Sequence, residues 1–300
     1  MNEFKQRNDH YRISPTAKFV AHARALSDIP YSPEIAEAVN AGEVTRRFLG
    51  DVDKMQFLVG VTAPYVEARY KAVNRGLMLK GFRNVLELAM GVSPRGLERA
   101  SKSLGIYVGT DLPGLLEESS EILRGIALRH DICTDCLYFC PANALSEEQL
   151  RTASEHFKGE RFGICHEGLL MYLTRDEQAK LAGNLRKLLV QSNGYWITPD
   201  VNSIEQMEKW LNVYPPEIRK TLESALAGIS EKTGRNVKEN NFSTNEEAEK
   251  FFTSLGFTVE TFPFYDGSEL STSRLLPEDL KPRILGSLSS RAAWILKPKV

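Results

Sequence analysis

The stretch Val85–Leu97, "VLELAMGVSPRGL", decides the fold, because an apolar run breaks there into a turn that holds Gly91 and Gly96. A parallel strand that ends at a glycine turn before a helix is where α/β folds most often hold a nucleotide. Glycine in such a turn lets backbone N–H groups and the next helix N-terminus approach a polar ligand closely. The stretch therefore predicts a strand, a ligand-binding turn and a helix, with Gly91 at the closest approach.

From Asn84 onward, short apolar runs alternate with amphipathic segments, and this alternation predicts a mostly parallel sheet of an α/β fold. Strands are expected at 84–90, 106–111, 136–140, 161–167, 194–199, near the end of 243–264, and at 291–299. Helices are expected at 93–104, 112–128, 146–157, 174–190 and at the start of 243–264.

The segments before the first strand carry helical spacing at 14–26, 32–50 and 63–82. They predict an N-terminal helical cap over residues 1–82, followed by a core over 83–300. A polar, helix-prone stretch at about 200–242 interrupts the alternation and predicts a helical insertion at the edge of the sheet, with a lid as one use for it.

The composition is that of an ordinary globular chain, with 300 residues, 42% of them hydrophobic and 26% charged. The net charge of -1 provides no field that would draw the chain to nucleic acid or to an anionic membrane. We therefore expect a small-molecule partner, no nucleic acid and no membrane. Residues 1–15 are polar and no apolar run of about 18 residues occurs, so a cytoplasmic location is expected.

Cys133, Cys136 and Cys140 lie close together, downstream of His130. A structural zinc site usually needs a second pair of ligands, and only Cys165 and the residue after it follow. We expect no metal, free thiols, and cysteine acting as a small hydrophobe in a buried strand at 136–140.

Asp111 stands at the carboxyl end of the second expected strand, 20 residues beyond Gly91. An acid at that place can accept hydrogen bonds from both ribose hydroxyls, so an adenosine-containing ligand is expected. The turn Ala89–Pro94 lacks the G-x-G-x-x-G pattern of dinucleotide sites. Glu87 inside the strand needs a cationic partner, either the ammonium of S-adenosylmethionine or a local Arg83 or Arg95.

The sequence resembles the leucine carboxyl methyltransferase family, including its bacterial branch of polyketide O-methyltransferase-like members. The resemblance rests on "SPTAKFVAHARA", "EARYKAVNRGL", "VLELAMGVSPRGL", "TDLP", "PANAL", "HEGLLMYLT" and "SRAAWILKP". It implies a Rossmann-like class I methyltransferase fold of seven strands, of which one is antiparallel, and S-adenosyl-L-methionine as cofactor. The eukaryotic relatives carry a G-x-G-type first turn, whereas this chain has "AMGVSPRG".

The resemblance also implies which residues bind the cofactor. Arg69 would hold its carboxylate, assisted by Lys18 or Arg24, and Arg95 would order the first turn. The methionine end would lie at Glu87, Ala89 and Gly91, and the ribose at Asp111. The adenine would lie among Leu112, Asn143, Ala144 and Leu145. The methyl-transfer centre would face Glu167 and Gly168.

The expected reaction is methyl transfer to a carboxylate or hydroxyl of a small molecule, in which positioning does most of the work. A carboxylate needs no base, whereas a phenol would benefit from one. His166 and Tyr172 are local candidates, although strand alternation points His166 away from the face of Glu167. We assign no catalytic residue and keep Tyr172 as a weak candidate.

Three other functions compete with this one: carboxyl methylation of a protein C-terminus, an NAD-dependent dehydrogenase, and a ligand-binding module without catalysis. Tyr65, Trp210 and Tyr214 could stack against an aromatic acceptor or belong to the core. The acceptor and the oligomeric state are left open.

Overall fold

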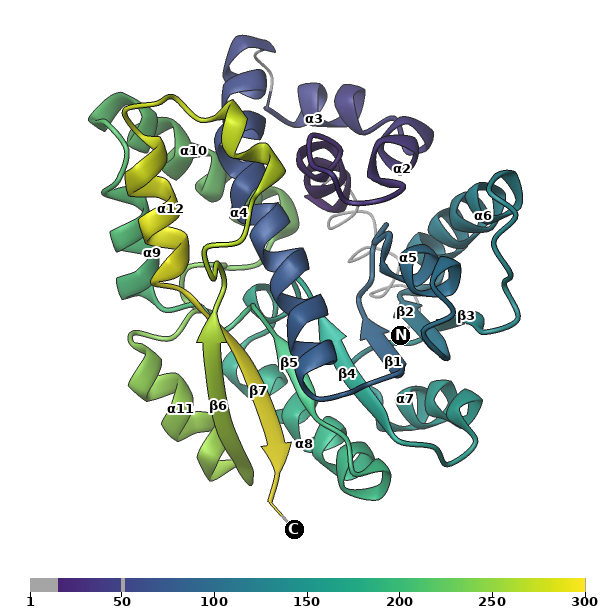
Figure 1. Cartoon of the computed structure of the whole chain (residues 1–300). Helices are drawn as coiled ribbons and strands as arrows, with labels where there is room; N and C mark the ends of the chain where they lie inside the picture. Colours follow the sequence, from purple (N-terminus) through teal and green to yellow (C-terminus); the bar gives the residue numbers. More distant parts are fainter. Residues whose placement is uncertain (1–15, 50–51, 300) are drawn as a thin grey trace.

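The computed structural model describes residues 16–49 and 52–299, and the polar segment 1–15 lies outside them. The fold is a seven-stranded sheet with the order β3-β2-β1-β4-β5-β7-β6 (Figure 1). Neighbours among β1 to β5 are parallel, and β7 is antiparallel to both β5 and β6. The expected fold class, with its antiparallel last strand, is confirmed. The strands are β1 Asn84–Leu88, β2 Tyr107–Asp111, β3 Leu137–Pro141, β4 Phe162–His166, β5 Trp196–Thr198, β6 Phe257–Pro263 and β7 Ala292–Pro298.

Helices cover both faces of the sheet and form one apolar core on each. One face packs against α2 Ser32–Ala38, α4 Val52–Leu79, α5 Arg95–Ser101 and α6 Pro113–Arg129. The other face packs against α7 Glu147–Ser154, α8 Arg175–Ser192 and α11 Asn245–Ser254. The central strands β1, β2 and β4 are therefore buried throughout, as a parallel sheet requires.

A third apolar cluster lies at the carboxyl ends of the strands, away from the two sheet cores. It joins α4 to α9 Ile204–Leu211, α10 Pro216–Thr233 and α12 Lys281–Ser289. The predicted insertion thus contributes α9 and α10, which lie beside α4, above β6 and β7 in the view of Figure 1.

The helix expected at 63–82 begins eleven residues earlier, at Val52, and carries Pro64 in its interior. Proline is typical of the first turn of a helix, because the N–H that it lacks would have no intrahelical partner there. Here the preceding turns bury Leu58, Val59 and Val61, and this packing keeps the chain helical through the proline. A helix at 16–24 and α3 Ala41–Leu49 precede α4, close to where the spacing places them.

The strand expected to be buried at 136–140 is instead the half-exposed edge strand β3, in which only Leu137 is buried. Cys133 and Cys136 are exposed and precede the strand. The edge position explains the difference, because β3 has a neighbouring strand on one side only. The sequence analysis also missed α12, whose apolar positions Ile284 and Leu288 recur at helical spacing.

Candidate active site

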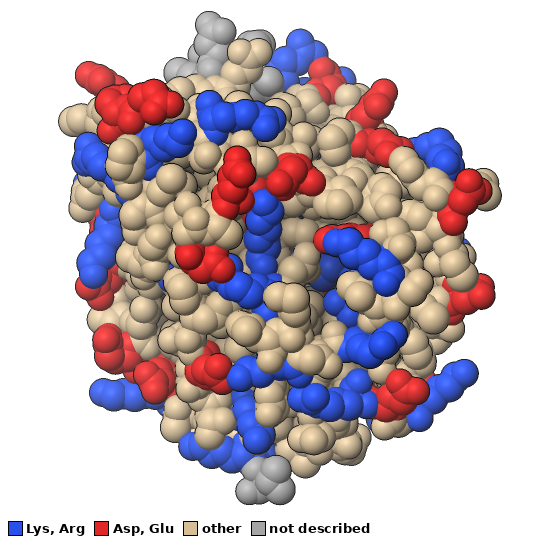
Figure 2. All heavy atoms as spheres, viewed as in Figure 1, with Lys and Arg blue, Asp and Glu red and all other residues tan. Residues whose placement is uncertain are grey.

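A cavity of about 830 Å³ opens at the carboxyl ends of the parallel strands, within the size range of small-molecule sites. Its walls come from the strand-to-helix turns, the helix at 16–24, α4, α9 and α10. On the face seen in Figure 2, acidic and basic side chains are interspersed and the surface is hollowed near its centre.

The structure brings almost all of the predicted cofactor residues together at this cavity. Of the residues expected from the sequence to bind the cofactor or act as a base, those that line it are Arg69, Glu87, Ala89, Gly91, Asp111, Leu112, Asn143, Ala144, Leu145, Glu167 and Gly168, with Arg24 and Tyr172. Lys18 is not brought to it, because its Nζ pairs with Glu118 Oε1 at 2.6 Å. The register explains the gathering, since Glu87 pairs with Gly109 in β2 and with Cys165 in β4, so that the strands end side by side.

The first turn and Asp111 are joined by hydrogen bonds. The Gly91 N–H donates to Asp111 Oδ2 at 2.7 Å, and the Leu112 N–H donates to Oδ1 at 2.8 Å. Gly91 adopts a φ of 55°, in the left-handed region that glycine occupies without strain. Burial raises the pKa of Asp111 to about 6, although the two N–H donors act in the opposite direction. Each carboxylate oxygen retains a lone pair, which a ribose hydroxyl could use.

Glu87 has its cationic partner within the chain. Its Oε2 lies 3.2 Å from Arg95 Nε and accepts a hydrogen bond from the Tyr107 hydroxyl at 2.7 Å. The local pairing with Arg95 that the sequence left open is therefore present, and Arg83 is not involved in it. Arg95 is fully buried, donates to Asn74 Oδ1 and lies over the ring of Tyr70 at 4.3 Å.

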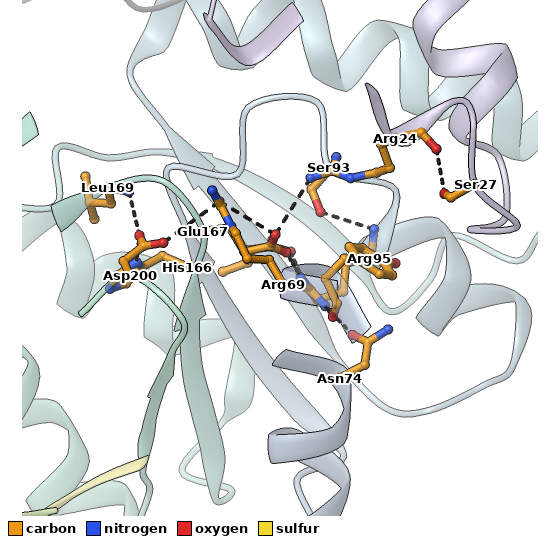
Figure 3. A network of polar contacts seen from close by, with 12 residues as sticks. Arg24, Ser27, Arg69, Asn74, Ser93, Arg95, His166, Glu167, Leu169 and Asp200 are labelled. Carbon is orange, nitrogen blue, oxygen red and sulfur yellow. Dashed lines mark hydrogen bonds and ion pairs between the residues drawn. The ribbon is translucent and has the colours of Figure 1, made fainter. Parts of the chain in front are cut away.

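Glu167 lies at the centre of a cluster of buried charges (Figure 3). Arg95 donates to its Oε1, while Nη2 atoms of Arg24 and Arg69 lie 3.9 and 3.8 Å from its Oε2. The last two distances exceed a hydrogen bond, so both guanidinium groups keep unused donors. Nε of Arg24 and of Arg69 is buried and has no hydrogen-bond partner among the described residues.

Asp200 is a cavity residue that the sequence analysis missed. It lies two residues after the end of β5 and accepts hydrogen bonds from Leu169 N at 2.7 Å and from His166 Nδ1 at 2.9 Å. Its Oδ1 lies 3.9 Å from Arg69 Nη2 (Figure 3). Burial by itself raises the pKa of Asp200, but His166 and Arg69 lower it to about 2 overall. The signal was present in the sequence, because Asp200 follows an apolar strand just as Asp111 does.

The two candidate bases are both engaged in structural contacts. His166 is fully buried, bonds to Asp200 and does not line the cavity, in agreement with the strand alternation. Tyr172 lines the cavity, and its hydroxyl bonds to Thr16 Oγ1 at 3.1 Å. Burial raises the pKa of the Tyr172 phenol, so it is a poor base at neutral pH.

The segment after β3 forms a further wall. The Asn143 side-chain oxygen accepts a hydrogen bond from the Leu145 N–H at 2.9 Å, while the Asn143 N–H donates to Gln149 Oε1 at 2.7 Å. These bonds fix an Asx-type turn whose residues line the cavity on the side of Asp111.

The opposite end of the cavity is aromatic and contains one more buried arginine. Tyr65, Met207 and Trp210 line it together with Arg291, which precedes β7. Tyr65 and Trp210 are thus wall residues, whereas Tyr214 is buried in the cluster of α4, α9, α10 and α12. Arg291 belongs to the quoted stretch "SRAAWILKP", but no pattern around it in the sequence assigns it a role.

Within residues 16–49 and 52–299, no group of three His, Cys, Asp or Glu side chains is placed to hold a metal ion, and the four cysteines are free thiols. No helix in the described part of the chain has the length and apolar character needed to cross a membrane.

Comparisons with known proteins were made at three levels. No protein-family model and no curated protein matches the chain. Among solved structures, the methyltransferase domain of a bacterial Hen1 protein is similar at 12% identity, covering 78% of this chain and 98% of that chain with a TM-score of 0.48. Magnesium protoporphyrin IX methyltransferase from Synechocystis PCC 6803 is similar at 10% identity, with coverages of 81% and 88% and a TM-score of 0.45.

A methyltransferase from Anabaena variabilis ATCC 29413 that is described as SAM-dependent is similar at 16% identity, with coverages of 72% and 77% and a TM-score of 0.43. At such identities the similarity concerns the fold, and the chemistry of this chain has to be derived from its own residues.

Proposed function

We propose that the protein is an S-adenosylmethionine-dependent O-methyltransferase that acts on a carboxylate or hydroxyl group of a small molecule. The observation that carries the proposal is the polarity of the cavity along its length. Buried arginines with unused donors lie on one side of the first turn, and the buried Asp111 lies on the other. The similarity to the leucine carboxyl methyltransferase family supports the same chemistry.

The residues present fit this cofactor. The unpartnered Nε atoms of Arg24 and Arg69 suit a carboxylate, because a guanidinium binds two oxygens in a planar fork. The carboxylates of Glu167 and Asp200 beside them suit an ammonium group. A Cβ at Gly168 would lie 3.4 Å from Arg69 Nη2, so the glycine leaves this arginine accessible.

The other end of the first turn suits an adenosine group. Asp111 would accept hydrogen bonds from the ribose, and Leu112 with Ala144 and Leu145 supplies apolar surface for a flat ring. The turn Ala89–Pro94 lacks the G-x-G-x-x-G pattern by which dinucleotide sites hold a pyrophosphate. This disfavours the dehydrogenase reading.

The cofactor would supply a methyl group bound to a sulfonium. The sulfur would leave as a neutral thioether, so no leaving anion has to be stabilised. The protein then contributes position and exclusion of water. Arg95 fixes Glu87 and Glu167 relative to one another, and Asp200 holds the turn after β4 through Leu169 N. None of the cavity side chains is needed as a base if the acceptor is a carboxylate.

The test is calorimetric titration of S-adenosylmethionine, S-adenosylhomocysteine and NADH into the wild type, Arg69→Met and Arg75→Met. Arg75 is the matched control, because it lies on the same helix but pairs with Asp266 outside the cavity. We expect micromolar binding of both sulfur ligands, a loss of about tenfold or more in Arg69→Met, no change in Arg75→Met, and no binding of NADH.

Absence of binding by either sulfur ligand would overturn the proposal. If they bind, acceptors are screened with methyl-labelled cofactor, and base treatment of the product separates methyl esters, which release methanol, from methyl ethers, which do not. Label transferred only to the C-terminus of a protein would favour the protein carboxyl methyltransferase instead.

A further inference from the structure

Arg291 is a buried cation without a carboxylate partner. Only 6% of its surface is exposed, and no Asp or Glu oxygen of the described residues lies within 4.0 Å of its guanidinium. Its Nη1 donates to Asn202 Oδ1 at 3.0 Å, and its Nη2 lies 3.5 Å from the backbone oxygen of Gln206. Both acceptors are neutral, and its buried Nε has no hydrogen-bond partner in the described part of the chain.

The neighbouring arginines are in a different situation. Arg24, Arg69 and Arg95 surround Glu167, and two more buried carboxylates, those of Glu87 and Asp200, lie beside them. A buried charge costs several kcal/mol unless it is compensated. The three arginines and three carboxylates balance one another, so this cluster has no charge to share with Arg291.

The surroundings of Arg291 indicate what would compensate it. The guanidinium lies 5.1 Å from the ring centre of Tyr65 and 6.0 Å from that of Trp210, and all three side chains line the cavity. Met207 and Leu226 add apolar wall on the same side. A ligand bound there would place an anionic group on Arg291 and an apolar or aromatic body against the two rings.

We propose that Arg291 determines the specificity for the methyl acceptor, and that the acceptor is a small molecule in which a carboxylate is attached to an aromatic or apolar body. The proposal rests on the function proposed above, because it takes the Asp111 end of the cavity to hold the cofactor. The carboxylate of the acceptor would neutralise the Arg291 guanidinium, and so supply the negative charge that no described residue provides there.

The experiment uses the full chain saturated with S-adenosylhomocysteine and titrated with phenylacetate, 3-phenylpropanoate and the corresponding neutral amides. Binding is measured for the wild type, Arg291→Gln, Arg291→Lys and the control Arg283→Gln, which alters an exposed arginine outside the cavity. We expect a carboxylate to bind at least about tenfold more tightly than its amide. Arg291→Gln should abolish the preference, Arg291→Lys should retain part of it, and Arg283→Gln should retain it fully.

Equal binding of carboxylates and amides by the wild type would overturn the proposal, and this comparison needs no variant that might fold poorly. A preference that survives in Arg291→Gln would overturn it as well. A pentapeptide with a free C-terminus and its C-terminal amide form a further pair. Tighter binding of the free peptide than of 3-phenylpropanoate would show that the acceptor is a protein C-terminus and overturn the proposal of a small-molecule acceptor. Failure of S-adenosylhomocysteine to bind in the first step would instead remove the proposed function.

Discussion

The two ends of the cavity differ in how their buried charges are neutralised. Around Glu167, arginines from the helix at 16–24, from α4 and from α5 meet carboxylates that follow β4 and β5. At Arg291 the guanidinium meets aromatic rings and neutral oxygens. At the first end the buried positive and negative charges are equal in number before any ligand binds, while Arg24 and Arg69 keep unused donors that a cofactor can use. The second end is incomplete, and its specificity comes from what a ligand adds.

The largest expected effect compares two buried arginines directly. Arg95→Met removes the cation between Glu87 and Glu167 and leaves these carboxylates buried without their closest partner. We expect it to lower the free energy of unfolding by about 3 to 5 kcal/mol. Arg291→Met removes a buried charge that has no partner, and it should change stability by less than about 1 kcal/mol or increase it.

Urea unfolding of both variants and of the wild type, followed by circular dichroism, measures this difference. Equal decreases in the free energy of unfolding for the two variants would contradict the claimed difference between the two ends. Arg291 would then have a compensating partner in the folded protein.

The second effect concerns pH and the Asp111 end. Since the pKa of Asp111 is raised to about 6, the folded protein favours the protonated acid, and this contribution to stability is lost as the pH rises through about 6. A ribose that donates to the carboxylate favours the ionised form. We therefore expect affinity for S-adenosylhomocysteine to increase about tenfold from pH 5 to pH 7.

Calorimetry between pH 5 and 8 tests the expected increase, with Asp111→Asn as the variant that cannot ionise. Its affinity should be lower and should not vary with pH over this range. An unchanged pH dependence in Asp111→Asn would assign the titration to another group.

The smallest expected effect concerns Lys18, the one predicted cofactor residue that the structure turns away from the cavity. Its partner Glu118 is 38% exposed, and pairs of this kind contribute about 0 to 1 kcal/mol. Lys18→Ala should change the dissociation constant of S-adenosylmethionine by no more than about twofold. A loss as large as that in Arg69→Met would show that Lys18 leaves Glu118 to bind the ligand.

Most of the fold could be predicted from local patterns, because each strand and helix of the core carries its own periodicity and turn residues. The errors occurred where distant packing decides. Pro64 lies inside α4 because the residues before it are buried by α9 and α12. The strand expected to be buried at 136–140 is half-exposed because β3 is an edge, and nothing in "CLYFC" specifies which strand will be last in the order.

A site residue could be predicted from the sequence where it stands at the carboxyl end of an apolar strand. Gly91 and Asp111 were found this way, whereas Glu167 came from the family resemblance, and Asp200 could have been found by the strand-end signal. Arg291 could not, because its meaning depends on the absence of an acid near it in space. A sequence pattern describes residues that are close along the chain. It cannot show that no carboxylate lies near Arg291 in the folded protein.

The sequence by itself determined the order of strands and helices, the glycine turn after the first strand and the acids at the strand ends. These features depend on residues within about one turn or one strand of each other, where backbone preferences and apolar periodicity act. Only the tertiary structure decided how the buried charges are shared. Arg95 lies between Glu87 and Glu167, and Arg291 is left to the cavity, because the energy of a buried charge depends on every charge near it in space.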